Sequence, residues 1–307
     1  MGQDNHNLSN KDQYKDQYKE GLMSLLLCMV IWGLLPIYWK ALIPIDSWVI
    51  ILYRVFLGFV VSAIWARTKY SWGEIFLPLF RDKQLAVKYF GAGLLITANW
   101  STYIWAVNAG FMIQSSIGYY IEPLVVCLLA IIIFKETLSN FKIIAFALAT
   151  LAIAIQLVHY KEFPGIALGL ATSFAIYAAI KKTVNQPPLI SMVYETLFLA
   201  PVAFVLIMYL ELTGGGATSM MHSPYQFGLL LLAGIVTVVP LVLFGSAAKK
   251  VPMVTLGLME YISPTMGMIL GVFVYHEPVD VVLLISLVII WIGLGFFTVS
   301  EVRENRK

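Results

Sequence analysis

The chain has 307 residues, of which 60% are apolar and only 12% are charged. Soluble domains are about 45–50% apolar and about 25% charged, so folding in water would leave a large apolar surface exposed. The composition therefore excludes an ordinary soluble domain and indicates a protein whose solvent is lipid. A formal net charge of +3 gives no indication of nucleic-acid binding.

Ten apolar segments follow one another, each long enough to cross a hydrocarbon core of about 30 Å as a helix. None alternates apolar and polar residues with a period of two, as the strands of a membrane barrel do. We therefore expect an all-α polytopic membrane protein with ten transmembrane helices. The expected spans are 21–39, 47–66, 86–107, 113–134, 141–158, 164–182, 190–210, 226–246, 253–275 and 279–299.

Lysines and arginines are distributed unequally between the two sets of flanking segments. One set comprises the polar N-terminal tail 1–20, the loops after the even-numbered spans and the basic C-terminal tail 300–307, and it holds 17 of the 20. The other set holds only Lys40 and Lys161, and Arg54 falls inside a span. Because cytoplasmic segments carry the excess of positive charge, both termini are expected in the cytoplasm.

The two halves of the chain resemble each other when one is shifted by 141 residues without a gap. The shift pairs Tyr53 with Tyr194, Arg54 with Glu195, Tyr120 with Tyr261, Pro123 with Pro264 and Glu136 with Glu277. Each half, 21–158 and 164–299, contains five spans, so the second half must enter the membrane from the opposite side. The sequence therefore predicts two inverted five-helix repeats, an architecture of secondary transporters with the substrate site near the midplane.

Four ionisable residues stand out inside the expected spans, where charge is costly and marks candidate functional sites: Arg54, Glu122, Glu195 and Glu260. Two interpretations stay open for Arg54 and Glu195. They pair, or flank a central cavity from opposite sides, or each interacts locally at its own end of the membrane. Glu122 and Glu260 lie deeper, and we expect them to line the cavity as substrate-binding residues.

Pro123 and Pro264 are expected to act as hinges, because a proline within a span removes a backbone hydrogen bond and can kink the helix.

Aromatic and polar residues cluster in the third span: Asn99, Trp100, Tyr103, Trp105 and Asn108. Tyr103 follows Asn99 by four residues, so the two share a helix face. Two interpretations are open for these aromatic residues. They enclose a planar or cationic substrate, or they form an aromatic belt at the membrane interface, which is the favoured interpretation for Trp105. The predicted substrate contacts also include Asn99, Trp100, Tyr103, Tyr120 and Tyr261.

Several chemistries have no motif in the sequence. There is no phosphate-binding loop that ends in Gly-Lys-Ser or Gly-Lys-Thr, no Cys-x-x-Cys, no His-Glu-x-x-His and no Gly-x-Ser-x-Gly. Cys28 and Cys127 lie inside apolar segments, where we expect buried neutral thiols. No cofactor, metal ion or catalytic residue is predicted.

Six segments resemble one known family along the whole chain: WGLLPIYWKAL (32–42), NWSTYIWAVN (99–108), GYYIEPL (118–124), YETLFLAP (194–201), TVVPLVLFGSAA (237–248) and EYISPT (260–265). They resemble the RarD family of the EamA-type drug/metabolite transporters. The resemblance implies ten helices in two inverted EamA repeats, a bacterial inner membrane, and export or exchange of small metabolites, often amino-acid-like or amphiphilic. The family usually has Asn where Glu122 stands and Gln where Glu260 stands, so this chain adds two carboxyls.

Together these features predict a secondary active transporter that works by alternating access and is driven by a substrate or ion gradient, with protons as a candidate. Its partners are a small-molecule substrate and the lipid bilayer, and it functions as a monomer or homodimer. A passive channel for a small solute and, less favoured, an intramembrane enzyme are the alternatives.

Overall fold

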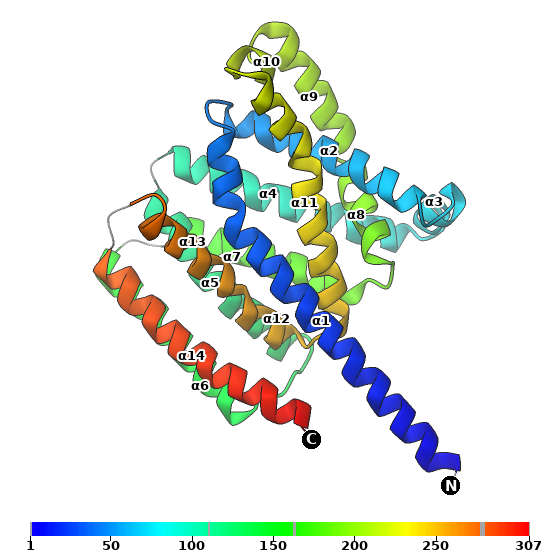
Figure 1. Ribbon diagram of the computed structural model, residues 1–307, viewed down its shortest axis with the longest axis vertical. Coiled ribbons are helices and arrows are strands. Elements are labelled where there is room, and N and C mark those ends of the chain that lie inside the picture. Colours follow the sequence, from blue (N-terminus) through cyan, green and yellow to red (C-terminus); the bar gives the residue numbers. More distant parts are fainter. Residues whose placement is uncertain (1, 110, 162–163, 277–279, 307) are drawn as a thin grey trace.

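The computed structural model describes residues 2–109, 111–161, 164–276 and 280–306, and every regular element in them is helical (Figure 1). In chain order the helices are α1 (Gly2–Ala41), α2 (Ser47–Arg67), α3 (Trp72–Arg81), α4 (Lys83–Asn108), α5 (Met112–Ile132), α6 (Asn140–Tyr160), α7 (Gly165–Thr183), α8 (Pro188–Leu197), α9 (Ala200–Thr213), α10 (Ala217–Met220), α11 (Pro224–Lys250), α12 (Met253–Glu260), α13 (Ile262–Phe273) and α14 (Val281–Arg306).

Seven helical segments of the described chain are long and apolar enough to cross a membrane, with α12 and α13 forming one of them. The pair α8 and α9, bent by 53°, makes an eighth if it is one span. Helices α4 and α7 coincide with the third and sixth predicted spans but do not reach the same apolarity, since they carry polar residues such as Asn99 and Lys181. The polytopic all-helical class is confirmed, whereas the number of ten spans is not.

Helix packing brings distant parts of the chain together. Helix α5 packs on α7 and α12, α1 packs on α11 and α13, and α2 packs on α8, α9 and α11. Helices α6 and α14 lie side by side along one edge of the bundle (Figure 1). The largest cluster of buried apolar residues lies among α1, α4, α5, α6, α7, α11, α12 and α14.

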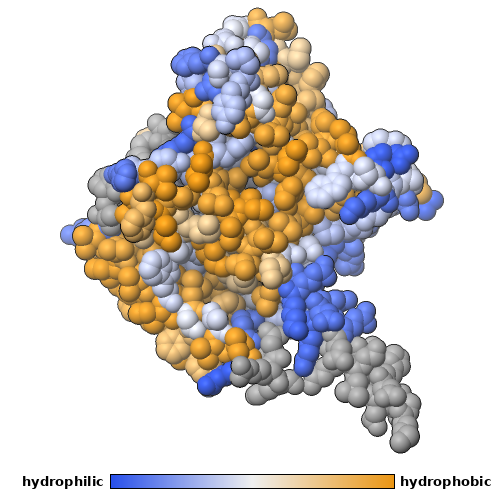
Figure 2. Space-filling view, in the orientation of Figure 1, coloured by the Kyte–Doolittle hydropathy of each residue, from blue (hydrophilic) through white to orange (hydrophobic). Residues whose placement is uncertain are grey.

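Apolar side chains also cover the outside of the bundle. Figure 2 shows hydrophobic residues across the middle of the visible face and hydrophilic residues gathered at its margins. Large apolar residues are exposed on most of the long helices, for example Val158 at 75%, Val205 at 64% and Ile292 at 53%. Such a surface is stable in contact with lipid chains, which identifies a multi-pass membrane protein.

We call the two opposite sides of the bundle the termini side and the far side. The termini side holds Tyr18, the segment 133–139 and the turn at Val251. The far side holds the segments 42–46 and 214–216. Helix α1 begins at Gly2 in the polar tail and continues into the bundle, and Tyr18 within it is 8% exposed.

Candidate functional site

Arg54 of α2 contacts aromatic rings from two other helices. Its guanidinium carbon lies 4.5 Å from a ring centre of Trp39 in α1 and 4.1 Å from that of Trp100 in α4. Its Nε donates a hydrogen bond of 3.2 Å to Oγ1 of Thr237 in α11. Within the described residues no carboxylate lies within ion-pair distance of Arg54. Four helices therefore hold this cation by ring contacts and one neutral hydrogen bond.

Tyr119 of α5 connects Arg54 with the carboxyl groups. Its ring packs edge-on against Tyr103 of α4, with 5.2 Å between ring centres. It lies within electrostatic range of both Arg54 and Glu122. The ring of Tyr119 contacts Tyr103, and 36% of the Tyr119 surface remains accessible. We call Trp39, Arg54, Trp100, Tyr103, Tyr119 and Glu122 the central cluster.

Glu122 and Glu260 are both buried, at 8% and 4% exposure. They come from α5 and α12, which pack against each other, and they lie within electrostatic range of one another. Neither carboxyl oxygen of Glu260 has a hydrogen-bond partner. That these two carboxyls line a substrate cavity stays a prediction.

The two prolines affect their helices differently. Pro264 has no N–H for the carbonyl of Glu260, four residues earlier, and the helix breaks at Tyr261 between α12 and α13. Pro123 has the same relation to the carbonyl of Tyr119, yet α5 runs through it without interruption. Each proline frees the backbone carbonyl of a residue beside the central cluster.

Three other predicted contact residues hold helices together. Nδ2 of Asn99 donates to the carbonyl of Leu170 at 2.8 Å and to Oγ of Ser173 at 3.0 Å, which ties α4 to α7. The Tyr261 hydroxyl donates to the carbonyl of Tyr120 at 3.0 Å, and both tyrosines are buried. The side chain of Asn108 lies outside the described residues, and Trp105 is 48% exposed.

Glu195 does not reach Arg54. Its carboxylate pairs with Nζ of Lys181 in α7 at 2.5 Å and accepts a hydrogen bond of 3.0 Å from the Tyr177 hydroxyl. Both members of the ion pair are about 1% exposed. Of the two interpretations of the Arg54–Glu195 correspondence, direct pairing is therefore absent among the described residues, and Glu195 interacts locally.

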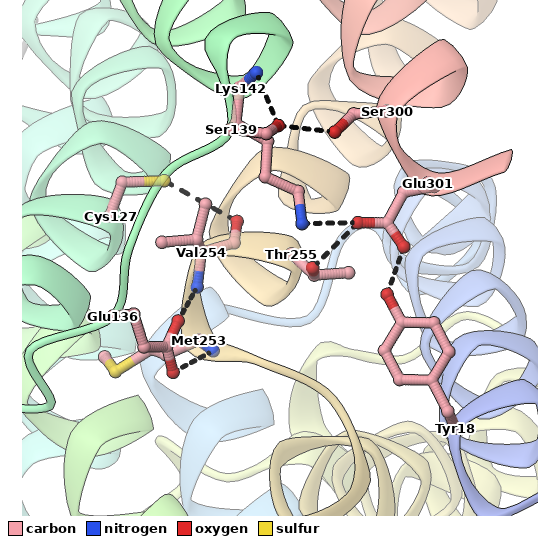
Figure 3. Close-up of polar contacts among 10 residues, drawn as sticks. All are labelled: Tyr18, Cys127, Glu136, Ser139, Lys142, Met253, Val254, Thr255, Ser300 and Glu301. Carbon is pink, nitrogen blue, oxygen red and sulfur yellow. Dashed lines mark hydrogen bonds and ion pairs between the residues drawn. The ribbon is translucent and has the colours of Figure 1, made fainter. Parts of the chain in front are cut away.

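A polar network closes the termini side beyond the carboxyl pair (Figure 3). The carboxylate of Glu136 accepts the backbone N–H groups of Met253 at 2.8 Å and Val254 at 2.9 Å, which caps the first turn of α12. Nζ of Lys182 lies 3.7 Å from the same carboxylate.

A second part of the network joins four helices around Glu301 of α14 (Figure 3). This carboxylate pairs with Nζ of Lys142 at 3.0 Å and accepts hydrogen bonds from Thr255 at 3.1 Å and from Tyr18. The first turns of α12 are thereby fixed to α1, α6 and α14.

Sequence reasoning missed Trp39, Tyr119 and Thr237. Tyr119 had a usable signal, because the 141-residue shift places it on Glu260. Trp39 and Thr237 lie within segments that resemble the family, but nothing in their spacing distinguishes them from packing residues. No cluster of three or more metal-ligating side chains occurs in the part of the chain that is described. The arrangement is suited to binding an anionic group at Arg54 between aromatic rings.

Comparisons with known proteins define the class. A family model described as the EamA-like transporter family matches residues 19–158 and again residues 164–299. A chain in a solved crystal structure, only 14% identical, has the same fold with a TM-score of 0.71, covering 93% of this chain and 98% of that one. The molecule is thus a polytopic helical protein of transporter fold.

Curated relatives cover nearly the full length of the chain. It is 36% identical to the uncharacterized transporter YojE of Bacillus subtilis over 94% of this chain and 96% of the relative. It is 33% identical to protein RarD of Escherichia coli over 95% of this chain and 98% of the relative. The chain belongs to the EamA-like transporter family, within the drug/metabolite transporters, as its six signature segments predicted.

Proposed function

We propose that the protein is a secondary active transporter that moves a small metabolite across the bacterial inner membrane by alternating access, as an exporter or exchanger. The observation that carries this proposal is Arg54, a cation inside the bundle that contacts two tryptophan rings and has no carboxylate partner among the described residues. A substrate with a carboxylate or another anionic group supplies the missing counter-charge. Its apolar part lies against Trp100, Tyr103 and Tyr119.

The architecture that we propose has ten spans in two inverted five-helix repeats. The two family matches support it, as do glycines at equivalent places. Gly93 of α4 and Gly234 of α11, 141 residues apart, each adjoin a backbone carbonyl, that of Glu195 in α8 and that of Leu57 in α2. Helices α2 and α8 are themselves repeat counterparts. In this scheme α4 and α7 cross the membrane, since 26 and 19 residues span about 39 and 28 Å as helices.

The termini side faces the cytoplasm in this proposal, because it carries the excess of positive charge. Lys142, Lys181, Lys182 and Lys250 on that side each form an ion pair with a glutamate. These ion pairs support the proposal that the conformation described is closed toward the cytoplasm. Alternating access requires the contacts of Glu136 and Glu301 with α12 to open when the substrate is exchanged on that side.

A ligand-stabilisation screen on detergent-purified protein tests the proposal. Anionic and zwitterionic metabolites are expected to raise the unfolding temperature of the wild type and to do so less in Arg54→Lys, which keeps the charge but loses the planar contacts. Hits are then tested for counterflow in proteoliposomes. Trans-stimulation by unlabelled substrate supports a transporter, whereas its absence with preserved flux favours a passive channel. Chemical conversion of the ligand would instead support the alternative that the protein is an intramembrane enzyme.

A further inference from the structure

Glu260 is a carboxyl that the protein buries without a partner. It is 4% exposed, neither oxygen has a hydrogen-bond partner, and it takes part in no ion pair of the described residues. Burying an ionised carboxylate in this way costs several kcal/mol, even after relaxation. In contrast, Glu195 is equally buried but has Lys181 and Tyr177 as partners. The surroundings of Glu195 therefore stabilise an ionised carboxylate, whereas the surroundings of Glu260 favour a neutral carboxylic acid.

The groups that face Glu260 do not supply a cation. Cys28 faces it from α1, Glu122 and Cys127 face it from α5, and Tyr261 is its neighbour in the chain. The two thiols have their own acceptors, since Cys28 donates to the carbonyl of Pro240 and Cys127 to that of Val254. Helices α11, α13 and α14 also touch α12, and their described residues bring no charged group to Glu260. A second carboxyl is thus the principal electrostatic neighbour.

We propose that Glu260 and Glu122 form a proton-binding site, in which Glu260 holds the proton in this conformation and Glu122 is the second carboxyl of the coupled pair. An Oε–H bond forms at one carboxylate and neutralises it, and the same proton is later returned to water on the other side of the membrane. This proposal rests on the proposed transport function and adds the coupling ion to it. The ligand of this carboxyl pair is the proton, whereas the substrate occupies Arg54.

The pair also lies where a change of charge can move helices. Glu260 ends α12 at the break before α13, and Glu122 precedes Pro123 in α5. While one proton is bound, α5 and α12 pack together and the Tyr261 hydroxyl reaches Tyr120. Loss of the proton leaves two carboxylates facing each other in a medium of low dielectric constant, which favours separation of the two helices. Proton binding is thereby linked to opening of this contact.

Infrared spectroscopy of the full-length protein in detergent tests the site without a substrate. At pH 7 the wild type is expected to show the carbonyl band of a protonated carboxylic acid, and the double variant Glu122→Gln/Glu260→Gln is expected to lose it. Glu195→Gln is the matched control, because it removes an equally buried carboxyl that has a lysine partner, and it should keep the band. Size-exclusion chromatography and circular dichroism establish that each variant is folded.

Coupling between Glu260 and Glu122 is tested by following the same infrared band as the pH is changed. Two coupled carboxyls release their protons in two steps, so the wild type should titrate in two steps and Glu122→Gln in one. Absence of the band in the wild type, its persistence in the double variant, or a two-step titration of Glu122→Gln overturns the proposal. These results do not depend on transport, so a failed substrate screen with an intact band contradicts the proposed function and leaves the proton site standing.

Discussion

The hydroxyl of Tyr261 donates a hydrogen bond of 3.0 Å to the backbone carbonyl of Tyr120, a residue exactly 141 positions earlier. One tyrosine lies in each of the two family matches, 19–158 and 164–299, and the two touch each other. In the proposed architecture of two inverted repeats, this is a contact between equivalent residues of the two halves. The bond lies at the packing of α5 on α12, beside both buried carboxyls.

Gly93 and Gly234 are predicted to be required for close packing of their helices against α8 and α2. A Cβ added at Gly93 would lie 2.0 Å from the carbonyl oxygen of Glu195, and one at Gly234 would lie 2.7 Å from that of Leu57. Because backbone atoms cannot move aside as a flexible side chain can, Gly93→Ala and Gly234→Ala should each destabilise the protein by about 1–3 kcal/mol or more. Thermal unfolding in detergent measures the loss.

The same two helices supply matched controls. Gly91 in α4 and Gly228 in α11 have no atom within 4 Å of an added Cβ. Gly91→Ala and Gly228→Ala should therefore leave stability unchanged or raise it slightly, because alanine favours the helix. Equal effects of all four substitutions would contradict the role of close packing.

The buried pair of Lys181 and Glu195 gives a second prediction. Removing one partner leaves an uncompensated buried charge, so Lys181→Met and Glu195→Leu alone should each cost about 3–5 kcal/mol. The double variant should be close to the wild type in unfolding temperature, since no buried charge remains. Arg54→Ala combined with Glu195→Leu is the control pair, and its effects on stability should add. Strict additivity of the Lys181 and Glu195 effects would argue against the pair.

Sequence alone located this glutamate but left its partner open between Arg54 and a local group. Lys181 was counted among the flanking charges because it comes last in an apolar segment, next to Lys182. In the structure only Lys182 lies at the surface of the termini side, whereas Lys181 turns inward to Glu195. Helix positions follow from apolar runs and could be predicted. The direction in which a terminal lysine points depends on packing between α7 and α8, and no periodicity encodes it.

Arg54 and Glu260 were found from sequence because a charge inside an apolar segment is conspicuous. Their surroundings were not found, because Trp39, Tyr119 and Thr237 come from three other helices. In the sequence, a tryptophan or threonine of the site looks the same as one that only packs between helices. The two are distinguished only when the packing of the helices is known. The termini-side network escaped notice for a related reason, since Glu136 and Glu301 lie in flanks where charges are expected.

The cap that Glu136 places on α12 should control access to Cys127. This thiol is 1% exposed and contacts the carbonyl of Val254, whose own N–H the Glu136 carboxylate accepts. Glu136→Ala frees the first turn of α12, so a water-soluble thiol reagent should label Cys127 more than tenfold faster, which corresponds to about 1.4 kcal/mol of easier local opening. Mass spectrometry of a Cys28→Ala background measures the rate.

Glu74→Ala is the control for that experiment. Glu74 is an exposed carboxylate that caps α3 through Ser71, far from the first turn of α12 in sequence and without a contact to it in the described residues. Its loss should leave labelling of Cys127 unchanged. An unaltered rate in Glu136→Ala would show that the cap does not hold this side closed.

The proposed orientation predicts opposite labelling of two single cysteines. In a background without Cys28 and Cys127, a cysteine at Gly215 on the far side should react with an impermeant thiol reagent in intact cells. One at Gly73, at the start of α3, should react only after the membrane is permeabilised. Both positions accept a Cβ, with the nearest atoms 3.5 Å away at Gly215 and 4.0 Å away at Gly73. The reverse pattern would place both termini outside the cytoplasm.

Asp280 should make stability depend on pH at the far end of the α6–α14 pair. Its carboxylate accepts a hydrogen bond from the Tyr160 hydroxyl of α6 and caps α14 through the N–H groups of Val282 at 2.7 Å and Leu283 at 3.2 Å. The Tyr160 hydroxyl, followed by these backbone groups, holds the pKa of Asp280 below its usual range. A lowered pKa in the folded state means that the stabilisation is complete above the ordinary value of about 4 and is lost as pH falls through the lowered one.

Asp280→Asn and Tyr160→Phe should therefore lower the unfolding temperature at pH 7, and the difference from wild type should shrink as the pH falls below about 4. The double variant should lose less than the sum of the two, because both substitutions break the same bond. Thermal unfolding in detergent across this pH range supplies the measurement. If Tyr160→Phe keeps the pH dependence of the wild type, then the backbone cap alone, and not the link from α6 to α14, is the source of the lowered pKa.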